Sequence, residues 1–383
     1  MLPIGLGIAQ LLAWGTSYYA IAVIGPPIQQ ELQLSSAELF GVFTWSLVLS
    51  GLLAPWAGRL LDRRGGRFVL ASSGMIGACG FALLASVTSR FELYASWTLL
   101  GIAMALGLYD TCFAALAQAT PANYRKSVTG VTLIAGLAST VAWPVSHQLL
   151  QTITWRGACF GYAGAQLACS VIYVCVLPAS HVPIARAAQH PAQSAETQRL
   201  SRMLALAFAG AAFIAGAFSA HLIQTLTALQ ISHERAVWLA STVGITQVGG
   251  RLLESMFGQR HSALALGCVT FGGLALSTAM LLGVSSVPWL VFPFVVLYGA
   301  ANGLITICKA AIPVELLGFE GAGATLGNFS APSLLTRAAA PFACAVLTDS
   351  TGLTGTLIVV TLVGALSLGA FVYLTRARKP TEA

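Results

Sequence analysis

The residues Gly58-Arg-Leu60-Leu-Asp62-Arg63-Arg-Gly65-Gly-Arg67 form a short charged stretch between two long apolar segments. A degenerate copy, Gly250-Arg-Leu252-Leu-Glu254-Ser-Met-Phe-Gly258-Gln-Arg260, follows 192 residues later, again between apolar segments. Glycine, leucine, an acid and a trailing glycine and arginine keep nearly the same register in both copies. A polar turn that recurs at half the chain length indicates two related halves.

The chain around these turns has too few charges for a water-soluble protein. Of its 383 residues, 8% are charged and 57% are hydrophobic, whereas a soluble domain carries roughly 25% charged residues. The composition excludes a soluble enzyme, a disordered chain and a collagen-like chain. A membrane-spanning helix needs about 20 apolar residues. The sequence predicts twelve such helices, at residues 3–27, 37–60, 68–89, 93–118, 128–150, 157–178, 203–228, 236–257, 262–283, 287–311, 323–347 and 354–375.

A polar stretch at 179–202 separates the first six predicted spans from the last six. The expected fold is therefore an all-α membrane protein of twelve transmembrane helices in two pseudo-symmetric six-helix bundles. Its N-terminal half is 1–178, its linker 179–202, its C-terminal half 203–375 and its tail 376–383. The linker and the tail are too short for a soluble signalling domain, which argues against a non-transporting membrane sensor. We expect a monomer.

The net charge of +7 indicates the orientation of the chain in the membrane. With the spans as predicted, fifteen of the 19 basic residues lie on the side of the termini, three lie on the other side, and Arg337 lies inside a span. The positive-inside rule then places both termini and the linker in the cytoplasm. No basic patch gathers on one soluble surface, so we expect no nucleic-acid partner.

Cysteine spacing and short motifs give no sign of catalysis. The eight cysteines lie in apolar runs without CxxC spacing, so we expect small buried hydrophobic side chains and no metal site. No Walker motif and no HExxH motif are present, and we expect neither an enzyme nor a cofactor. The first basic residue is Arg59, so the opening apolar segment is predicted to be a retained helix and not a cleaved signal peptide.

At its charged turn the sequence resembles the major facilitator superfamily. The family motif G-x-L-x-D-R-x-G-x-R is matched at every fixed position by Gly58, Leu60, Asp62, Arg63, Gly65 and Arg67. The resemblance extends to the six-plus-six spans, the middle loop and the degenerate second motif. It implies a secondary active transporter that works by alternating access, in which this loop holds the inner gate. The alternative is a tight cytoplasmic turn whose arginines set the topology.

Two further stretches resemble bacterial carriers near the monocarboxylate and oxalate/formate group. They are Trp14-Gly-Thr-Ser-Tyr18-Tyr19 in the first span and Ala142-Trp143-Pro144 in the fifth. The drug-exporter pattern G-x(3)-G-P-x(2)-G-G is not matched after Gly136. The resemblance implies a multi-pass protein of the bacterial inner membrane, whose partners are the lipid bilayer, a small-molecule substrate and a coupling ion, for which we expect a proton.

Ionisable residues inside the membrane are the first candidates for function, because a charge there costs about 2.5–3.5 kcal/mol on insertion scales. Asp110 lies roughly 26 Å from the outer end of the fourth span, at ~1.5 Å per residue. It is either a proton or cation site, or a structural acid paired with Arg125 or Lys126. Arg337 lies roughly 21 Å from the inner end of the eleventh span. It either binds a carboxylate substrate bidentately or pairs with Asp110, Asp349 or helix carbonyls.

Polar side chains at helical spacing add candidates for the cavity. His221 shares a helix face with Gln224 and Thr225, and is either a carrier of a coupled proton or a hydrogen-bonded structural residue. Polar and aromatic stripes run along the first, fifth and tenth spans and face either a cavity or a neighbouring helix. The residues expected to line the cavity are Trp14, Tyr18, Trp143, Tyr298 and Asn302, together with His221, Gln224 and Arg337.

Two transport functions remain open from the sequence. The first is movement of a small organic anion such as a monocarboxylate, coupled to protons or by exchange, with Arg337 as the anion contact. The second is efflux of a cationic or amphipathic drug-like compound that uses Asp110 and the aromatic lining. The direction of transport is open in both.

Overall fold

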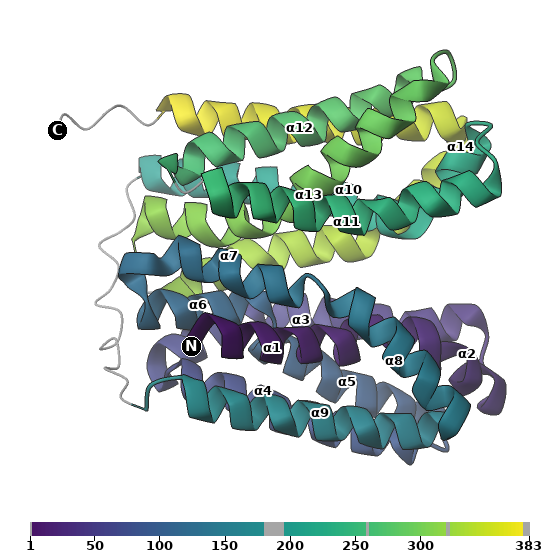
Figure 1. The fold of residues 1–383 in the computed structure, drawn as a ribbon, viewed down its shortest axis with the longest axis vertical. Helices are drawn as coiled ribbons and strands as arrows, with labels where there is room; N and C mark the ends of the chain where they lie inside the picture. The colour runs from purple at the N-terminus through teal and green to yellow at the C-terminus, as the bar shows by residue number, and fades with distance from the viewer. Residues whose placement is uncertain (1, 180–194, 258–259, 319–321, 378–383) are drawn as a thin grey trace. The chain divides into compact units, whose positions relative to one another are not determined.

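The computed structural model describes residues 2–179, 195–257, 260–318 and 322–377, and these residues are almost entirely helical (Figure 1). The chain divides into two compact units, one of residues 1–188 and 317–331, the other of residues 189–316 and 332–383. Most of the predicted linker, at 180–194, and the end of the predicted tail, at 378–383, lie outside the described residues. The predicted domain boundaries stay a prediction.

The first unit contains the helices of the first six predicted spans. In chain order they are α1 (Leu2–Trp14), a π-helical turn (Gly15–Tyr19), α2 (Ile21–Glu31), α3 (Ser36–Arg64), α4 (Gly66–Ala85), α5 (Arg90–Gly107), α6 (Tyr109–Ala119), a 3₁₀ turn (Pro121–Asn123), α7 (Tyr124–Ala135), α8 (Ala138–Thr152) and α9 (Trp155–Val176). Three predicted spans, the first, fourth and fifth, are therefore interrupted helices. The start of α14 also belongs to this unit.

The second unit contains the helices of the last six predicted spans. They are α10 (Ala195–Ala228), α11 (His233–Phe257), α12 (Ala263–Gly283), a 3₁₀ turn (Pro288–Leu290), α13 (Val291–Leu317) and α14 (Ala322–Ala377). The helix α14 covers two predicted spans, because the chain turns at Gly352, where φ is 73°. A positive φ at this turn favours glycine, which has no Cβ to clash.

Ten described segments are long and apolar enough to cross a membrane. One of them, Ala322–Arg376, contains the turn at Gly352 and accounts for two of the predicted spans. The helix α11 is not among the ten, since it carries acidic and basic residues that lower its hydropathy. The structure is consistent with the predicted count of twelve and confirms the all-α fold.

Small residues allow close packing within each unit. In the first unit α4 lies against α5 and α9, and a Cβ added at Gly77 would come within 2.9 Å of Gln166 on α9. In the second unit Gly303 of α13 lies against Gln247 of α11, and an added Cβ would come within 2.5 Å of the Gln247 carbonyl oxygen. Close approach of backbones through small residues is the usual packing mode of membrane helices, since the lipid removes the hydrophobic drive between them.

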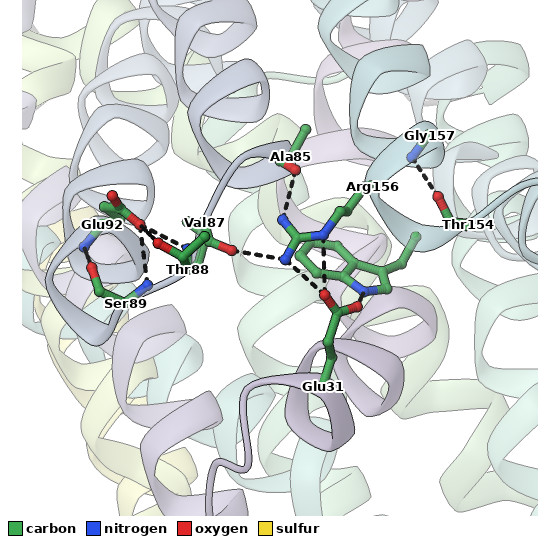
Figure 2. Close-up of polar contacts among 10 residues, drawn as sticks. Glu31, Ala85, Val87, Thr88, Ser89, Glu92, Thr154, Arg156 and Gly157 are labelled. Atoms are coloured by element: carbon green, nitrogen blue, oxygen red, sulfur yellow. Dashed lines mark hydrogen bonds and ion pairs between the residues drawn. The ribbon is translucent and has the colours of Figure 1, made fainter.

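A polar network joins three helices at one end of the first unit, around the guanidinium of Arg156 (Figure 2). Its nitrogens donate to the Ala85 carbonyl at 2.8 Å, to the Val87 carbonyl at 2.8 Å, and to Glu31 Oε1 at 2.7 and 3.1 Å. The Trp155 ring lies 4.4 Å from the guanidinium, and its indole nitrogen donates to the same Glu31 carboxylate. The network fastens the end of α2 to α4 and α9.

The substitution Arg156→Lys is expected to lower the free energy of unfolding by about 1–2 kcal/mol, because an ammonium cannot reproduce the planar fork of donors. The matched control is Arg90→Lys. Arg90 pairs with Glu38 at 2.9 Å, but its side chain is 68% exposed, so its replacement is expected to cost at most about 0.5 kcal/mol. Thermal melts of the purified protein measure both. Equal shifts of the melting temperature in the two variants would show that the carbonyl contacts of Arg156 do not contribute to stability.

Candidate functional site

Aromatic side chains gather around the π-helical turn of the first unit. The ring of Trp14 lies 5.2 Å from that of Tyr18, and Tyr19 lies 5.9 Å from Trp143 on α8. The Trp143 indole nitrogen also donates to the Tyr19 carbonyl at 3.2 Å. Three predicted cavity residues, Trp14, Tyr18 and Trp143, therefore lie in one cluster. A π-turn within an α-helix often marks a functional site, and no sequence pattern predicts this one.

The fourth span is broken at Leu108, where ψ is −171°, between α5 and α6. The break leaves the Gly107 carbonyl outside the regular helical pattern. The Gln10 side-chain nitrogen donates to that carbonyl at 2.6 Å, and the same nitrogen donates to the Tyr173 hydroxyl at 3.0 Å. Thr111 in turn donates to the Ala105 carbonyl at 2.8 Å. Side chains thus replace the water that a broken helix would otherwise require.

This break places Asp110 in the first turn of a helix and not in the middle of one. The positive end of the α6 dipole stabilises a carboxylate at that position. Asp110 is half-buried and lies within electrostatic range of the Tyr124 phenol on α7. Its neighbour Tyr109 lies 5.0 Å from Trp14, which joins the aromatic cluster to the break in the fourth span. Asp110 belongs to the first unit and Arg337 to the second.

Two buried polar atoms near these features have no hydrogen-bond partner among the described residues. They are the side-chain oxygen of Gln10 and the indole nitrogen of Trp14. Gln10 is fully buried. Buried polar atoms are nearly always satisfied in proteins, so an unsatisfied acceptor and donor on consecutive turns of α1 mark a place where a ligand or water could bind.

The charged turn between α3 and α4 binds the start of α14. The Asp62 carboxylate is 8% exposed. It accepts hydrogen bonds from the backbone N–H groups of Gly323 at 3.1 Å and Ala324 at 2.8 Å, and from the Gln118 side chain at 3.2 Å. Asp62 therefore satisfies donors at a helix N-terminus, where its negative charge also interacts favourably with the dipole. The motif is compatible with a carboxylate that meets a helix N-terminus or a basic partner, and the structure identifies the N-terminus of α14.

Glycines make this contact possible. A Cβ at Gly58 would collide with the Gly323 carbonyl, and one at Gly327 would collide with the Ala54 carbonyl. Gly65 has a φ of 86° and ends α3, a conformation that glycine adopts without strain. Arg63 is exposed and Arg67 is half-buried in the same turn. A side chain at either fixed glycine of the motif, Gly58 or Gly65, would therefore be sterically unfavourable.

Two polar residues of the degenerate second motif, Arg251 and Glu254, are buried in the second unit. Arg251 is 5% exposed and its Nε donates to the Gly303 carbonyl at 3.2 Å, while Glu254 is 3% exposed. The distribution of charge along the sequence indicates only that Arg251 lies near a helix end. The recurrence of the motif was the signal that could have identified both residues as buried polar groups.

His221 and Gln224 lie together on α10, as their spacing predicts. The two side chains are 3.2 Å apart, and His221 Nε2 lies 2.9 Å from the Pro341 carbonyl on α14. Because a carbonyl oxygen only accepts, the proton of the neutral imidazole is on Nε2. The Gln224 amide faces Nδ1, and it can present either its oxygen or its nitrogen there. This arrangement accommodates a neutral or a doubly protonated ring.

Arg337 is half-buried on α14, with its positive charge within electrostatic range of the Tyr298 phenol on α13. Tyr298 is 3% exposed and lies against Phe218 and Phe294, with ring centroids 5.0 and 5.7 Å away. A Cβ at Gly216 of α10 would collide with the Arg337 carbonyl. Asn302 is half-buried one turn beyond Tyr298. The contact of Arg337, Tyr298 and Asn302 with substrate stays a prediction.

The cysteines are all free thiols, five of them buried. The expectation of buried side chains is wrong for Cys79 and Cys175, which are exposed on α4 and α9. An apolar thiol is tolerated on a lipid-facing surface, which apolar sequence context does not distinguish from a core. No group of three or more His, Cys, Asp or Glu residues is placed to hold a metal within the described ranges.

The comparisons with known proteins identify the family. The model of the Major Facilitator Superfamily matches residues 6–331. The fold is similar to that of the human organic anion transporter MFSD10 (TETRAN), with a TM-score of 0.76 and 17% identity over 96% of this chain and 99% of that one. It is also similar to the E. coli fucose:proton symporter FucP, with a TM-score of 0.73 and 12% identity over 99% of both chains. A search of the curated proteins finds no match. With a family model that covers most of the chain and two transporters of the same fold, this protein belongs to the major facilitator superfamily of membrane transporters.

Proposed function

We propose that this transporter is a secondary active carrier of a small organic anion, such as a monocarboxylate, that works by alternating access with proton coupling or exchange. The observation that carries the proposal is Arg337, a guanidinium half-buried in a membrane-spanning segment. Guanidinium recognises carboxylates through two parallel hydrogen bonds. A cation at this depth is costly, which supports a functional role.

Features of the first unit support a binding role there as well. The indole nitrogen of Trp14 is a donor without a partner among the described residues, and it lies beside the aromatic cluster of Tyr18 and Tyr109. Such a donor suits the acceptor oxygens of an anion. The name of MFSD10 describes an organic anion transporter, but at 17% identity the likeness supports the fold and not the substrate.

Asp110 and His221 are our candidates for the coupling groups. Asp110 is held at the N-terminus of α6 by the break at Leu108. His221 Nε2 donates to the Pro341 carbonyl, and its Nδ1 faces the Gln224 amide. FucP is described as a proton symporter, and this makes a proton the first coupling ion to test.

The second candidate function is efflux of a cationic or amphipathic compound, which the aromatic cluster beside Asp110 favours. A toxicity screen in a pump-deficient host separates it from anion transport. Resistance that disappears in Asp110→Asn would support efflux. We place the protein in the bacterial inner membrane on the resemblance to bacterial carriers, and both termini in the cytoplasm on the charge distribution given above.

The substitutions Arg337→Ala and Arg337→Lys are expected to lower uptake of the transported anion, by about 100-fold and at least about tenfold respectively, because one loses the charge and the other the bidentate fork. The measurement is uptake of labelled monocarboxylates into proteoliposomes. The control is Arg376→Gln, which removes an exposed cation from the end of the same helix and is expected to retain wild-type rates. Wild-type uptake by both Arg337 variants would exclude the anion role.

A further inference from the structure

We propose that the second unit holds a binding site for a small organic amine with an apolar body, in a cavity between α10 and the two legs of α14. The cavity has a volume of about 310 Å³, at the lower end of the ~300–1,000 Å³ typical of ligand pockets. All of its lining residues come from α10 and α14 within the second unit. It lies next to the turn at Gly352, where α14 reverses direction.

The carboxylate of Asp349 gives the cavity its charge preference. Asp349 lines the cavity and is exposed. No hydrogen bond or ion pair to Asp349 occurs among the residues that the structure describes. Arg337 cannot neutralise it, because twelve residues of helix separate the two by about 18 Å. A carboxylate without a partner at the wall of a small cavity attracts a cation and disfavours an anion.

The remaining walls suit the apolar body of such a ligand. Phe218 is 5% exposed and Leu357 is 4% exposed, and both line the cavity. The hydroxyls of Thr348 and Thr356 lie 2.9 Å apart and form a hydrogen bond with each other. The ligand therefore does not have to supply a polar group opposite them. The cavity therefore combines one charged anchor with apolar and aromatic surface, the usual composition of a small-molecule site.

This inference is separable from the proposed transport function. The cavity shares His221 and Gln224 with the candidate transport residues, but its charge comes from Asp349 and not from Arg337. An Arg337→Ala variant is therefore expected to lose anion uptake and to keep amine binding. Failure of one proposal leaves the other standing.

The test is binding of 2-phenylethylamine to the purified full-length protein at pH 8, measured by isothermal titration calorimetry. The matched ligands are 2-phenylethanol, which lacks the charge, and phenylacetate, which reverses it. The amine is expected to bind at least about tenfold more tightly than either, because the ammonium forms a charge-assisted hydrogen bond to the carboxylate. Asp349→Asn is expected to weaken amine binding about tenfold, and Asp349→Glu to retain it within about threefold.

The control variant is Glu234→Gln, which removes an exposed carboxylate from the first turn of α11, outside the cavity. It is expected to bind the amine as the wild type does. A second variant, Ala345→Leu, fills the cavity from its wall and is expected to weaken the amine and the alcohol alike. Absence of amine binding, equal binding of the three ligands, or full binding by Asp349→Asn would each overturn the proposal.

Discussion

An Asp62→Asn variant is expected to fold and to transport at least about tenfold more slowly than the wild type. The carboxylate accepts two backbone N–H groups at the first turn of α14, at 3.1 and 2.8 Å. Asparagine keeps the size of the side chain but removes the charge and one accepting oxygen. The loss of a hydrogen bond to a charged group costs about 1.5–3 kcal/mol, which corresponds to roughly 10- to 100-fold in an equilibrium constant.

The expected transport defect follows from the fact that α14 has residues in both compact units. Its residues up to 331 pack with the first unit, and its residues from 332 onwards belong to the second. In the alternating access that we propose, the contact of Asp62 with α14 forms in one state and breaks in another, so weakening it changes the population of those states. The resemblance to the family implies the same gating role for this turn.

The Asp62 prediction is checked by uptake into proteoliposomes together with hydrogen exchange at the amides of Gly323 and Ala324. Both amides are expected to exchange faster in Asp62→Asn, because their acceptor is weakened. Asp349→Asn is the control, since it removes a carboxylate from the same helix far from these amides and is expected to leave their exchange unchanged. Unaltered exchange in Asp62→Asn would contradict the capping role.

A Gln10→Leu variant is expected to show the second largest loss, a fall in transport of at least about tenfold. Gln10 is fully buried and donates to the Gly107 carbonyl at the break in the fourth span, at 2.6 Å. Leucine leaves that carbonyl with the Tyr173 hydroxyl alone, at 3.5 Å. A buried carbonyl without a good donor costs about 1–3 kcal/mol. The hydrogen bond that stabilises the break is then lost, and with it the contact that keeps Asp110 at the start of α6.

The control for Gln10 is Ser170→Ala. Ser170 also donates from a buried side chain to a main-chain carbonyl, that of Ala71 at 2.7 Å, but its acceptor is on α4 and not at the break. Both variants are expected to lower the melting temperature, and only Gln10→Leu is expected to abolish transport and to speed hydrogen exchange over 109–112. Equal transport in the two variants would mean that the Gln10 contact stabilises the unit without positioning Asp110.

Patterning predicted the spans well because a span is a local property of the sequence. Apolar runs of about 20 residues identify helices whatever surrounds them, and the observed helices begin and end within a few residues of most of the predicted limits. The helix α10 is an exception, since it already includes Ala195, eight residues before the predicted span. The motif around Asp62 identified the family for the same reason, since its glycines and charges lie within ten consecutive residues.

Interruptions within spans could not be predicted in the same way. The break at Leu108 depends on Gln10 and Tyr173, which reach the Gly107 carbonyl from 97 and 66 residues away in sequence. Nothing local to Leu108 distinguishes it from other residues of an apolar run. The hydrogen-bond partner of His221 could not be predicted either, because the Pro341 carbonyl lies 120 residues away in the sequence.

The membrane environment, the helical fold and the family can all be read from the sequence, since composition, apolar run length and a contiguous motif are local properties of the chain. Which polar groups meet is visible only in three dimensions: Asp62 with the start of α14, Gln10 with the broken fourth span, and His221 with the Pro341 carbonyl. A buried polar group must find a partner in three dimensions. That partner is chosen by the packing of helices distant in sequence, which one-dimensional periodicity does not contain.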